Sequence, residues 1–274
     1  MNSKILVLGS TGKTGSRVAE RLQNLQIPTR LGSRNGNPFF SWEDSSNWQE
    51  VLAGIESVYI TFQPDLVVPQ AYEKIKFFTE IAKANNVKKL VLLSGRGSKK
   101  AQACEQLIIQ SGIDWTIIRV SWFMQNFSES FFLDSILSNE VVLPTIIALE
   151  PFIDADDIAA VAVAALTNNK HSQKIYELTG AELLSFESAT AQIAAALKRQ
   201  IVYTEISMDD YTAYLKTHQV PDDFIGLIQY LFAETLDGRN EYLTNDIKTI
   251  LGRKPNTFKD YITKTVKTGI WKIQ

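Results

Sequence analysis

The sequence predicts an α/β fold in which a doubly wound parallel sheet is followed by a smaller α+β lobe. Three observations lead to this prediction. Short apolar runs alternate with longer amphipathic segments up to about residue 120, a glycine-rich turn joins the first run to the first amphipathic segment, and the alternation fades beyond that point. Because strands that alternate with helices are joined by right-handed crossovers, this pattern produces a parallel sheet.

The expected strands are short, continuous apolar runs, as is typical of strands buried on both faces. The first is the Ile-Leu-Val-Leu run of residues 5–8, and after it Val18, Ala19, Leu22 and Leu25 recur at helical spacing. Further strands are predicted at 29–33, 57–62, 89–94 and 114–120, with a short additional candidate at 39–41, and helices at 70–85 and 101–110.

The C-terminal part of the chain predicts a mixture of helices and strands. A helix over 154–166 begins with an acidic turn, which suits the helix dipole. No Pro- or Ser-rich linker separates the halves, so we expect a domain over 1–150 and a smaller lobe over 151–274 that packs on it, with a partial return to the sheet around 151–180. This lobe would form the second wall of a cleft at the carboxyl ends of the strands, where open α/β sheets bind ligands. The other expected elements are strands at 175–178 and 200–206 and helices at 186–197, 208–216 and 224–236.

The composition argues against several functional classes. The 274 residues carry 28 Lys and Arg against 30 Asp and Glu, a formal charge of −2, which argues against a nucleic-acid binder. A single cysteine, Cys104, excludes a disulfide framework, and with only two histidines the chain lacks the usual zinc ligands, so no metal is expected. The first apolar run is too short for a signal peptide or a membrane span. We therefore expect a cytoplasmic protein that binds no membrane.

The glycine-rich turn after the first strand indicates a dinucleotide-binding site. Glycines at this spacing allow a tight turn and close approach of the backbone to a phosphate, and the following helix offers unpaired N–H groups to a diphosphate. The Gly-Lys-Thr triplet does not make a Walker A loop, because the glycine required five positions before Gly12 is Val7. A nucleoside triphosphatase is therefore excluded. The expected diphosphate-binding residues are Gly9, Ser10, Thr11, Gly12, Lys13, Thr14 and Gly15.

The end of the second strand predicts a preference for NADP(H) over NAD(H). An acidic residue there would bind the ribose 2′-hydroxyl of NAD, but no Asp or Glu occurs between residues 21 and 42. Ser33 and Arg34 stand at that position instead, with Arg30 earlier in the strand and Lys13 in the glycine turn. A guanidinium binds a phosphate through two parallel hydrogen bonds. We expect Ser33 and Arg34 to bind the 2′-phosphate, assisted by Lys13.

Several motifs together resemble the NmrA-like group of atypical short-chain dehydrogenases. They are the glycine turn, Ser33-Arg34, Ser94-Gly95, the Trp-Phe-Met-Gln-Asn-Phe run of 122–127 and the Pro-Phe-Ile-Asp-Ala-Asp-Asp-Ile-Ala run of 151–159. The segment 40–48, which contains Trp42 and Trp48, is also similar to the subgroup of ergot-alkaloid reductases. The resemblance implies a Rossmann domain that binds NADP(H) and a small lobe that closes a pocket.

The resemblance also implies roles for residues outside the glycine turn. The ribose, the nicotinamide and the reacting ring of the cofactor would lie beside Thr61, Phe62, Gln63, Ser94 and Gly95. Each of these residues, and each aromatic residue of the pocket, is equally compatible with packing in the core. The substrate pocket would be lined by Trp122, Phe123, Asn126 and Phe127.

The chain lacks the Tyr-x-x-x-Lys pair from which short-chain dehydrogenases normally donate a proton. Its only match, Tyr72 to Lys76, precedes Ser94, and the segment 96–110 after Ser94 contains no tyrosine. Isoflavone-reductase-like relatives use a lysine on the following helix, where the aligned residue here is Ala101. No catalytic residue is therefore predicted.

Two functions are compatible with cofactor binding without that acid. An NAD(P)H-dependent reductase could transfer hydride to a quinone, an azo compound or an iminium, because such acceptors are electrophilic enough to need no strong enzymatic acid. Alternatively, an NADP(H)-binding redox sensor would signal to a protein partner without turnover. We favour the reductase, whose partner is a small molecule, because an aromatic pocket around Trp122 and Phe127 suits a planar acceptor.

Overall fold

The computed structural model describes residues 4–130 and 132–273, and the chain divides into two compact units. This arrangement differs from the predicted division at residue 150, because the chain passes between the units more than once. A strand that follows the segment 121–154 pairs with the main sheet, so the chain has to return to the first unit. Among the described residues, unit 1 comprises 4–120, Ala155–Leu178 and Asn245–Arg253, and unit 2 comprises 121–130, 132–154, Thr179–Thr244 and 254–273.

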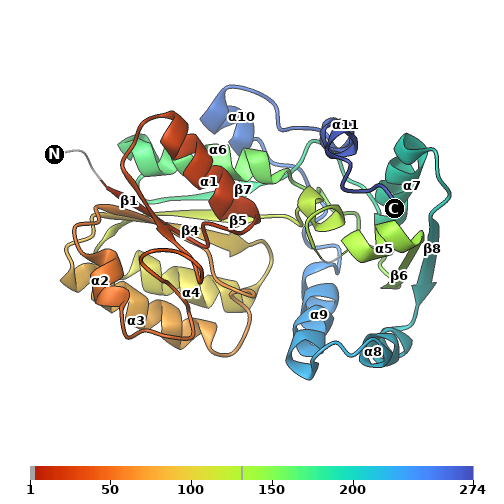
Figure 1. Ribbon diagram of the computed structural model, residues 1–274, viewed down its shortest axis with the longest axis horizontal. Coiled ribbons are helices and arrows are strands. Elements are labelled where there is room, and N and C mark those ends of the chain that lie inside the picture. Colours follow the sequence, from red (N-terminus) through yellow and green to blue (C-terminus); the bar gives the residue numbers. More distant parts are fainter. Residues whose placement is uncertain (1–3, 131, 274) are drawn as a thin grey trace. The chain divides into compact units, whose positions relative to one another are not determined.

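Unit 1 is a six-stranded parallel sheet with helices on both faces (Figure 1). The strand order is β2-β1-β3-β4-β5-β7, so the direction of winding reverses between β1 and β3, where open α/β sheets bind ligands. This arrangement confirms the predicted doubly wound α/β class. The strands are β1 (Ile5–Leu8), β2 (Thr29–Gly32), β3 (Ser57–Ile60), β4 (Lys89–Gly95), β5 (Asp114–Val120) and β7 (Lys174–Leu178). The helices are α1 (Lys13–Asn24), α2 (Trp48–Leu52), α3 (Ala71–Ala84), α4 (Lys99–Ile109), α6 (Ala155–Thr167), the 3-10 helix η2 (Asn169–His171) and α10 (Asp246–Leu251).

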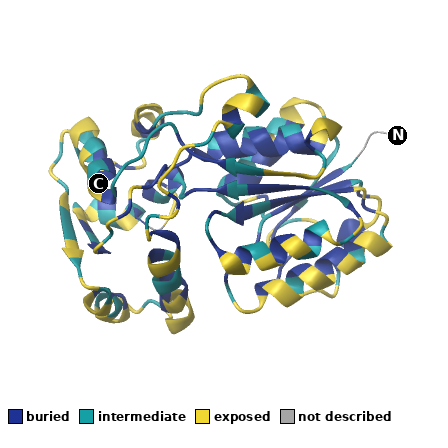
Figure 2. Cartoon of the chain, turned by 180° about the vertical axis from the view of Figure 1, so that it is seen from behind, coloured by how far each residue is buried: buried dark blue, intermediate teal, exposed yellow. Residues whose placement is uncertain are grey.

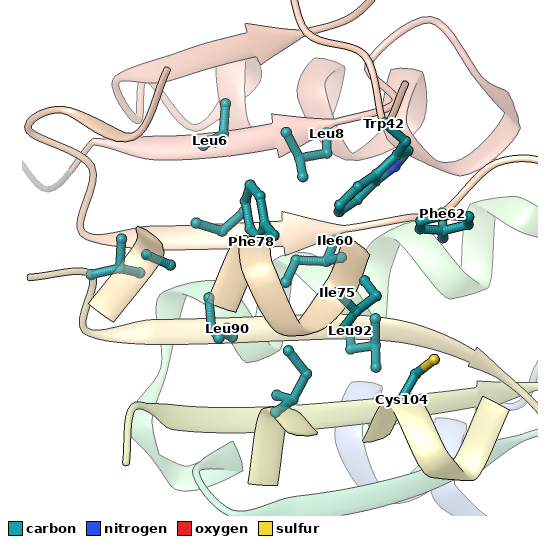
Figure 3. Packing of buried hydrophobic residues seen from close by; sticks show 14 of the residues in the cluster. Leu6, Leu8, Trp42, Ile60, Phe62, Ile75, Phe78, Leu90, Leu92 and Cys104 are labelled. Atoms are coloured by element: carbon teal, nitrogen blue, oxygen red, sulfur yellow. The ribbon is translucent and has the colours of Figure 1, made fainter. Parts of the chain in front are cut away.

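The central strands of unit 1 are mostly apolar because helices cover both faces of the sheet, whereas the edge strands β2 and β7 carry half-buried or exposed residues. Figure 2 shows the central strands of this unit as dark blue, buried segments between helices whose outer faces are yellow and exposed. Figure 3 shows the face that α2, α3 and α4 cover, where Leu6, Ile60 and Leu92 of the strands lie opposite Ile75 and Phe78 of α3. Helices α1 and α6 lie on the other face (Figure 1).

Unit 2 combines an aromatic core with a small parallel sheet. Strand β6 (Glu140–Pro144) pairs in parallel with β8 (Val202–Ile206). The core contains Phe132, Phe152 and Phe186, none of which is more than 1% exposed. No helix among the described residues is both long and apolar enough to cross a membrane. The helices of this unit are the 3-10 helix η1 (Met124–Phe127), α5 (Leu133–Ser138), α7 (Phe186–Leu197), α8 (Met208–Thr217), α9 (Asp222–Thr235) and α11 (Phe258–Thr268).

Some elements differ from the sequence-based expectation. The candidate strand at 39–41 is reduced to a single bridge between Phe39 and Ser33, because Pro38 cannot donate a backbone hydrogen bond. Helix α11 was not predicted, although Thr257 and Asp260 form a capping box at its start. The other elements that were not predicted from the sequence are α2, α5, β6, α10 and the two 3-10 helices η1 and η2.

Candidate functional site

The loop between β1 and α1 folds into a tight turn at the carboxyl edge of the sheet. Gly12 donates its backbone N–H to the carbonyl oxygen of Gly9 at 2.8 Å, and Ser10 donates its own to the carbonyl oxygen of Gly32 at 3.2 Å. Gly9 has a φ of +63°, a conformation that favours glycine. The turn therefore joins the end of β1 to the end of β2.

Gly15 allows α1 to approach the end of β1 closely. A Cβ atom at Gly15 would lie 2.2 Å from the carbonyl oxygen of Gly9 and 3.1 Å from that of Leu8. A Cβ atom at Gly9 would lie 2.4 Å from Oγ1 of Thr61. These are the close packing and tight turn that a dinucleotide-binding loop requires of its glycines.

The N-terminus of α1 is suited to an anion. Its N-cap residue is Gly12, which forms no side-chain cap, and its first turn contains no acidic residue. The hydroxyl of Ser16 donates to the carbonyl oxygen of Gly12 at 2.8 Å, so it does not occupy a backbone N–H of this turn. The helix dipole adds a partial positive charge at this end, and the backbone N–H groups point towards the space in front of it. The residues of the turn therefore fit a diphosphate.

A cleft of about 550 Å³ extends from the glycine turn along the end of β2. Ser10, Thr11 and Ser33 are among its lining residues, and Ser33 is only 7% exposed. Arg34 follows Ser33, is exposed, and forms no hydrogen bond or ion pair with any residue that the structure describes. Arg34 thus stands between Ser33 and Asn35, which line the cleft, and its guanidinium is available to a ligand.

Arg30, the other arginine of this region, has a structural role. Its Nη1 donates to the carbonyl oxygens of Glu50, Val51 and Ala53, at 3.2, 2.6 and 3.0 Å. These carbonyls belong to the C-terminal end of α2, where helices leave backbone acceptors without an internal partner. Arg30 therefore stabilises the end of α2, and it also lines the cleft beside β2.

The segment that follows β3 lies beside the glycine turn. Oγ1 of Thr61 donates to the carbonyl oxygen of Leu8 at 3.3 Å. The exposed side chain of Gln63 reaches the same turn, since its Nε2 lies 3.7 Å from the position of a Cβ atom at Gly12. Both residues therefore lie beside the glycine turn.

Phe62, by contrast, belongs to the hydrophobic core of unit 1. It is 7% exposed, and its ring centroid lies 4.8 Å from that of Trp42, next to which it appears in Figure 3. Nε1 of Trp42 donates to the carbonyl oxygen of Thr61 at 2.9 Å. The expectation that Phe62 follows the cofactor is corrected, because this ring packs the loop after β2 against the end of β3.

Ser94, at the end of β4, is bound to a buried carboxylate. Its Oγ donates to Oε1 of Glu105 on α4 at 2.6 Å, and the two residues are 3% and 0% exposed. Arg119 on β5 donates to both oxygens of the same carboxylate. Its Nε lies 3.0 Å from Oε1 and 3.1 Å from Oε2, and its Nη2 lies 2.7 Å from Oε2. Hydrogen bonding to Glu105 is the main cause that raises the pKa of Arg119. Gly95 is half-buried beside Ser94 and has space around it, since a Cβ atom there would meet nothing within 4 Å.

The network continues to the edge strand. Nη1 of Arg119 lies 3.4 Å from Oε1 of Glu177 on β7, and Nε of Arg96 lies 3.7 Å from the other oxygen of Glu177. Ser94, Arg119 and Glu177 are partners in register on three neighbouring strands, so they project to the same face of the sheet. Of this group, only Ser94 was predicted from the sequence.

The residues expected in a substrate pocket lie in unit 2 and differ in burial. Trp122, Phe123 and Asn126 are half-buried. Nε1 of Trp122 lies 3.4 Å from Oγ1 of Thr235 on α9, to which it donates. Phe127 is 0% exposed and packs on several phenylalanines of the core, so we correct the expectation that it lines a pocket.

The other titratable side chains near the predicted motifs are exposed or form ion pairs within unit 1. Tyr72 is 43% exposed on α3. At the start of α6, Asp156 binds Arg17 at 3.0 Å, and Asp157 binds Arg253 at 2.6 Å. Within residues 4–130 and 132–273, no group of three or more His, Cys, Asp or Glu side chains is arranged to hold a metal ion.

Comparison with known proteins identifies similar chains. A family model described as NAD(P)H-binding matches residues 9–169. Agroclavine dehydrogenase of Claviceps fusiformis is 28% identical over 277 residues, which cover 94% of this chain and 96% of that protein. Among solved structures, an NADPH-dependent quinone oxidoreductase of Escherichia coli in complex with NADPH has a TM-score of 0.81 at 19% identity, covering 96% of this chain and 99% of that one. A triphenylmethane reductase of a Citrobacter species in complex with NADP(H) has a TM-score of 0.80 at 15% identity, with the same coverage.

Proposed function

Because the chain belongs to the NAD(P)H-binding family, we propose that it is an NADPH-dependent reductase of a small electrophilic acceptor, of quinone, azo or iminium type. Family membership also confirms the NmrA-like resemblance of the sequence. The observation that carries the proposal is the glycine turn, in which Gly9 and Gly15 bring α1 against the end of β1 and leave its first turn without a side-chain cap. The bound cofactor would supply the hydride, and the chain would bind, orient and shield the reactants.

The proposed path of the cofactor follows the carboxyl edge of the sheet in unit 1. Its diphosphate would bind the glycine turn, and its nicotinamide would lie near Gln63, Ser94 and Gly95. The half-buried residues Trp122, Phe123 and Asn126 are the proposed contacts of the acceptor. Relatives that are named dehydrogenases support a small-molecule substrate, and the location in the cytoplasm stays a prediction.

The proposed preference for NADPH rests on Arg34, which is exposed and has no partner among the described residues. Replacing Arg34 by Ala is expected to raise the KM for NADPH by about 10–100-fold, because a charge-assisted contact to the 2′-phosphate contributes roughly 1.5–3 kcal/mol. The KM for NADH should change by less than about threefold, since that cofactor has no 2′-phosphate. Steady-state kinetics with both cofactors measure the difference. Arg34→Lys keeps the charge without the fork and should lie between the two, whereas equal losses for both cofactors would refute the assignment.

The reductase itself is tested by titrating the purified chain with NADPH in a calorimeter and then adding acceptors. We expect binding of the cofactor and its oxidation above background by at least one member of a panel of quinones, azo dyes and cyclic iminium ions. Tight binding without any oxidation, together with a protein that co-purifies, would instead assign the chain as a redox sensor. Absence of heat with either nicotinamide dinucleotide would overturn both functions.

A further inference from the structure

The segment that follows β3 packs directly against the glycine turn. Oγ1 of Thr61 donates to the carbonyl oxygen of Leu8, the last residue of β1, at 3.3 Å. A Cβ atom at Gly9 would lie 2.4 Å from the same Oγ1, and a Cβ atom at Gly12 would lie 3.7 Å from Nε2 of Gln63. This segment therefore forms one side of the turn, and its displacement would change the surroundings of a ligand bound there.

The sheet alone does not fix the position of Thr61. Strand β3 ends at Ile60, and its register with β4 ends at the pair of Ile60 and Leu92. The carbonyl oxygen of Thr61 lies beyond this register, where a backbone acceptor needs a donor from outside the ladder. Nε1 of Trp42 donates to it at 2.9 Å. The indole of Trp42 therefore fixes the chain at the point where it leaves β3.

Trp42 is itself held firmly in unit 1. Its side chain is 7% exposed and stands next to Phe62 in Figure 3. Nζ of Lys74 on α3 donates to the carbonyl oxygen of Trp42 at 2.5 Å. The loop that carries Trp42 is also attached beside the end of β2, because Phe40 donates its backbone N–H to the carbonyl oxygen of Ser33 at 2.9 Å. Trp42 therefore connects the segment after β3 to α3 and to the residue that follows β2.

We propose that Trp42 is a positioning residue for the dinucleotide, which acts by holding the carbonyl group of Thr61 and so keeps residues 61–63 against the glycine turn. This inference rests on the proposed reductase function. Without the hydrogen bond, the segment would occupy its binding form for a smaller fraction of the time, and the apparent affinity would fall by the same factor. The proposed 2′-phosphate contacts, Ser33 and Arg34, lie on a different segment. The loss is therefore expected to be equal for NADPH and NADH.

Trp42→Phe tests the proposal, because it keeps an aromatic ring in the core and removes the N–H group. The Kd for NADPH is expected to rise about 5–10-fold, the size of effect that one hydrogen bond produces, and the Kd for NADH by the same factor. Calorimetric titration measures both constants. Replacement of Trp42 by benzothienylalanine exchanges only the N–H group for sulfur and preserves the ring shape. It should raise both Kd values as much, with a smaller change in Tm.

Trp48 provides a matched control. It belongs to the same aromatic cluster, with its ring centroid 5.4 Å from that of Trp42, and it is 1% exposed. Its Nε1 also donates to a backbone carbonyl oxygen, that of Ser41, at 3.0 Å. Ser41 belongs to the loop after β2 and not to the segment beside the glycine turn. Trp48→Phe should therefore lower the Tm but leave both Kd values within about twofold of the wild type.

A double variant tests whether Trp42 acts through Thr61. Thr61→Val removes the hydroxyl that donates to Leu8 and keeps the shape of the side chain. Trp42→Phe combined with Thr61→Val should bind NADPH about as weakly as the weaker of the two single variants, because residues that act through one contact are not additive. Losses that multiply would show independent effects and would overturn the proposal.

The remaining outcomes separate this proposal from the reductase function. Equal rises in Kd for Trp42→Phe and Trp48→Phe would assign Trp42 to packing alone, and a rise confined to NADPH would assign its effect to the 2′-phosphate. Unchanged Kd values in both Trp42 variants would show that the hydrogen bond is not needed. Each of these results would overturn the proposal while leaving the reductase intact. A wild-type chain that binds neither dinucleotide would instead refute the reductase function, and the positioning role would fall with it.

Discussion

A Gly15→Ala variant is expected to lose measurable affinity for NADPH and to unfold about 6–12 °C below the wild type. The added Cβ would lie 2.2 Å from the carbonyl oxygen of Gly9 and 2.6 Å from its carbon. Both atoms are backbone, so relief requires moving α1 away from β1. Overpacking of this kind costs about 3 kcal/mol, and each kcal/mol shifts Tm by about 2–4 °C in a chain of this size. Thermal unfolding and calorimetric titration with NADPH measure the two effects.

Gly95→Ala is the control for this prediction. Gly95 also ends a strand at the carboxyl edge, but a Cβ atom there would meet nothing within 4 Å, and its φ is not positive. Its Tm should therefore stay within about 2 °C of the wild type, because no contact has to move. A Gly15→Ala chain with the Tm and affinity of the wild type would show that close approach of α1 is not what forms the diphosphate site.

The central sheet could be predicted because the apolar residues of a buried strand indicate its burial directly. Central strands with helices on both faces are apolar over most of their length, so runs such as Ile5–Leu8 are visible without knowledge of the partners. The glycine turn was equally visible, since its requirement for small residues is local. The positions of the strands also gave their ends. Thr61, Gln63 and Ser94 therefore lie at the carboxyl edge of the sheet, as expected from the ends of β3 and β4.

Burial of single aromatic residues could not be predicted in the same way. Phe62 and Phe127 stand at positions where a pocket residue and a core residue have the same chemistry, and only long-range packing distinguishes them. Phe62 meets Trp42 across twenty residues, and Phe127 meets Phe258 across much of the chain. The role of Arg30 depends on its hydrogen bond to the end of α2, and this short helix was not predicted from the sequence.

The pairing of Glu105 with Arg119 was also beyond sequence reasoning. The two residues lie on different elements, and nothing in the spacing of fourteen positions indicates an ion pair. Their contact arises because α4 packs on β4 and β5 and brings Glu105 under Ser94 and Arg119, which are partners in register. A local sequence motif contains only residues that are close in the chain. Ser94 was therefore predicted at the edge of the sheet, but its hydrogen-bond partner Glu105 was not.

Glu105→Ala is expected to lower the free energy of unfolding by about 3–5 kcal/mol, the cost of leaving a largely buried charge without its partner. Glu105 is 0% exposed and the side chain of Arg119 is 19% exposed, so little water can replace the lost carboxylate. Glu177 stays 3.4 Å from Arg119, but through a single longer contact instead of a fork. Urea denaturation followed by circular dichroism measures the change.

The double variant Glu105→Leu with Arg119→Met separates the charge from the packing. If the loss in Glu105→Ala comes from an uncompensated guanidinium, removing both charges should restore most of the stability, because apolar replacements of a buried ion pair are often neutral. Ser94→Ala removes a single hydrogen bond to a charged group and should cost about 1.5–3 kcal/mol. A double variant as unstable as Glu105→Ala would contradict this account and would show that the shape of the Glu105 side chain, and not its charge, holds α4 against the sheet.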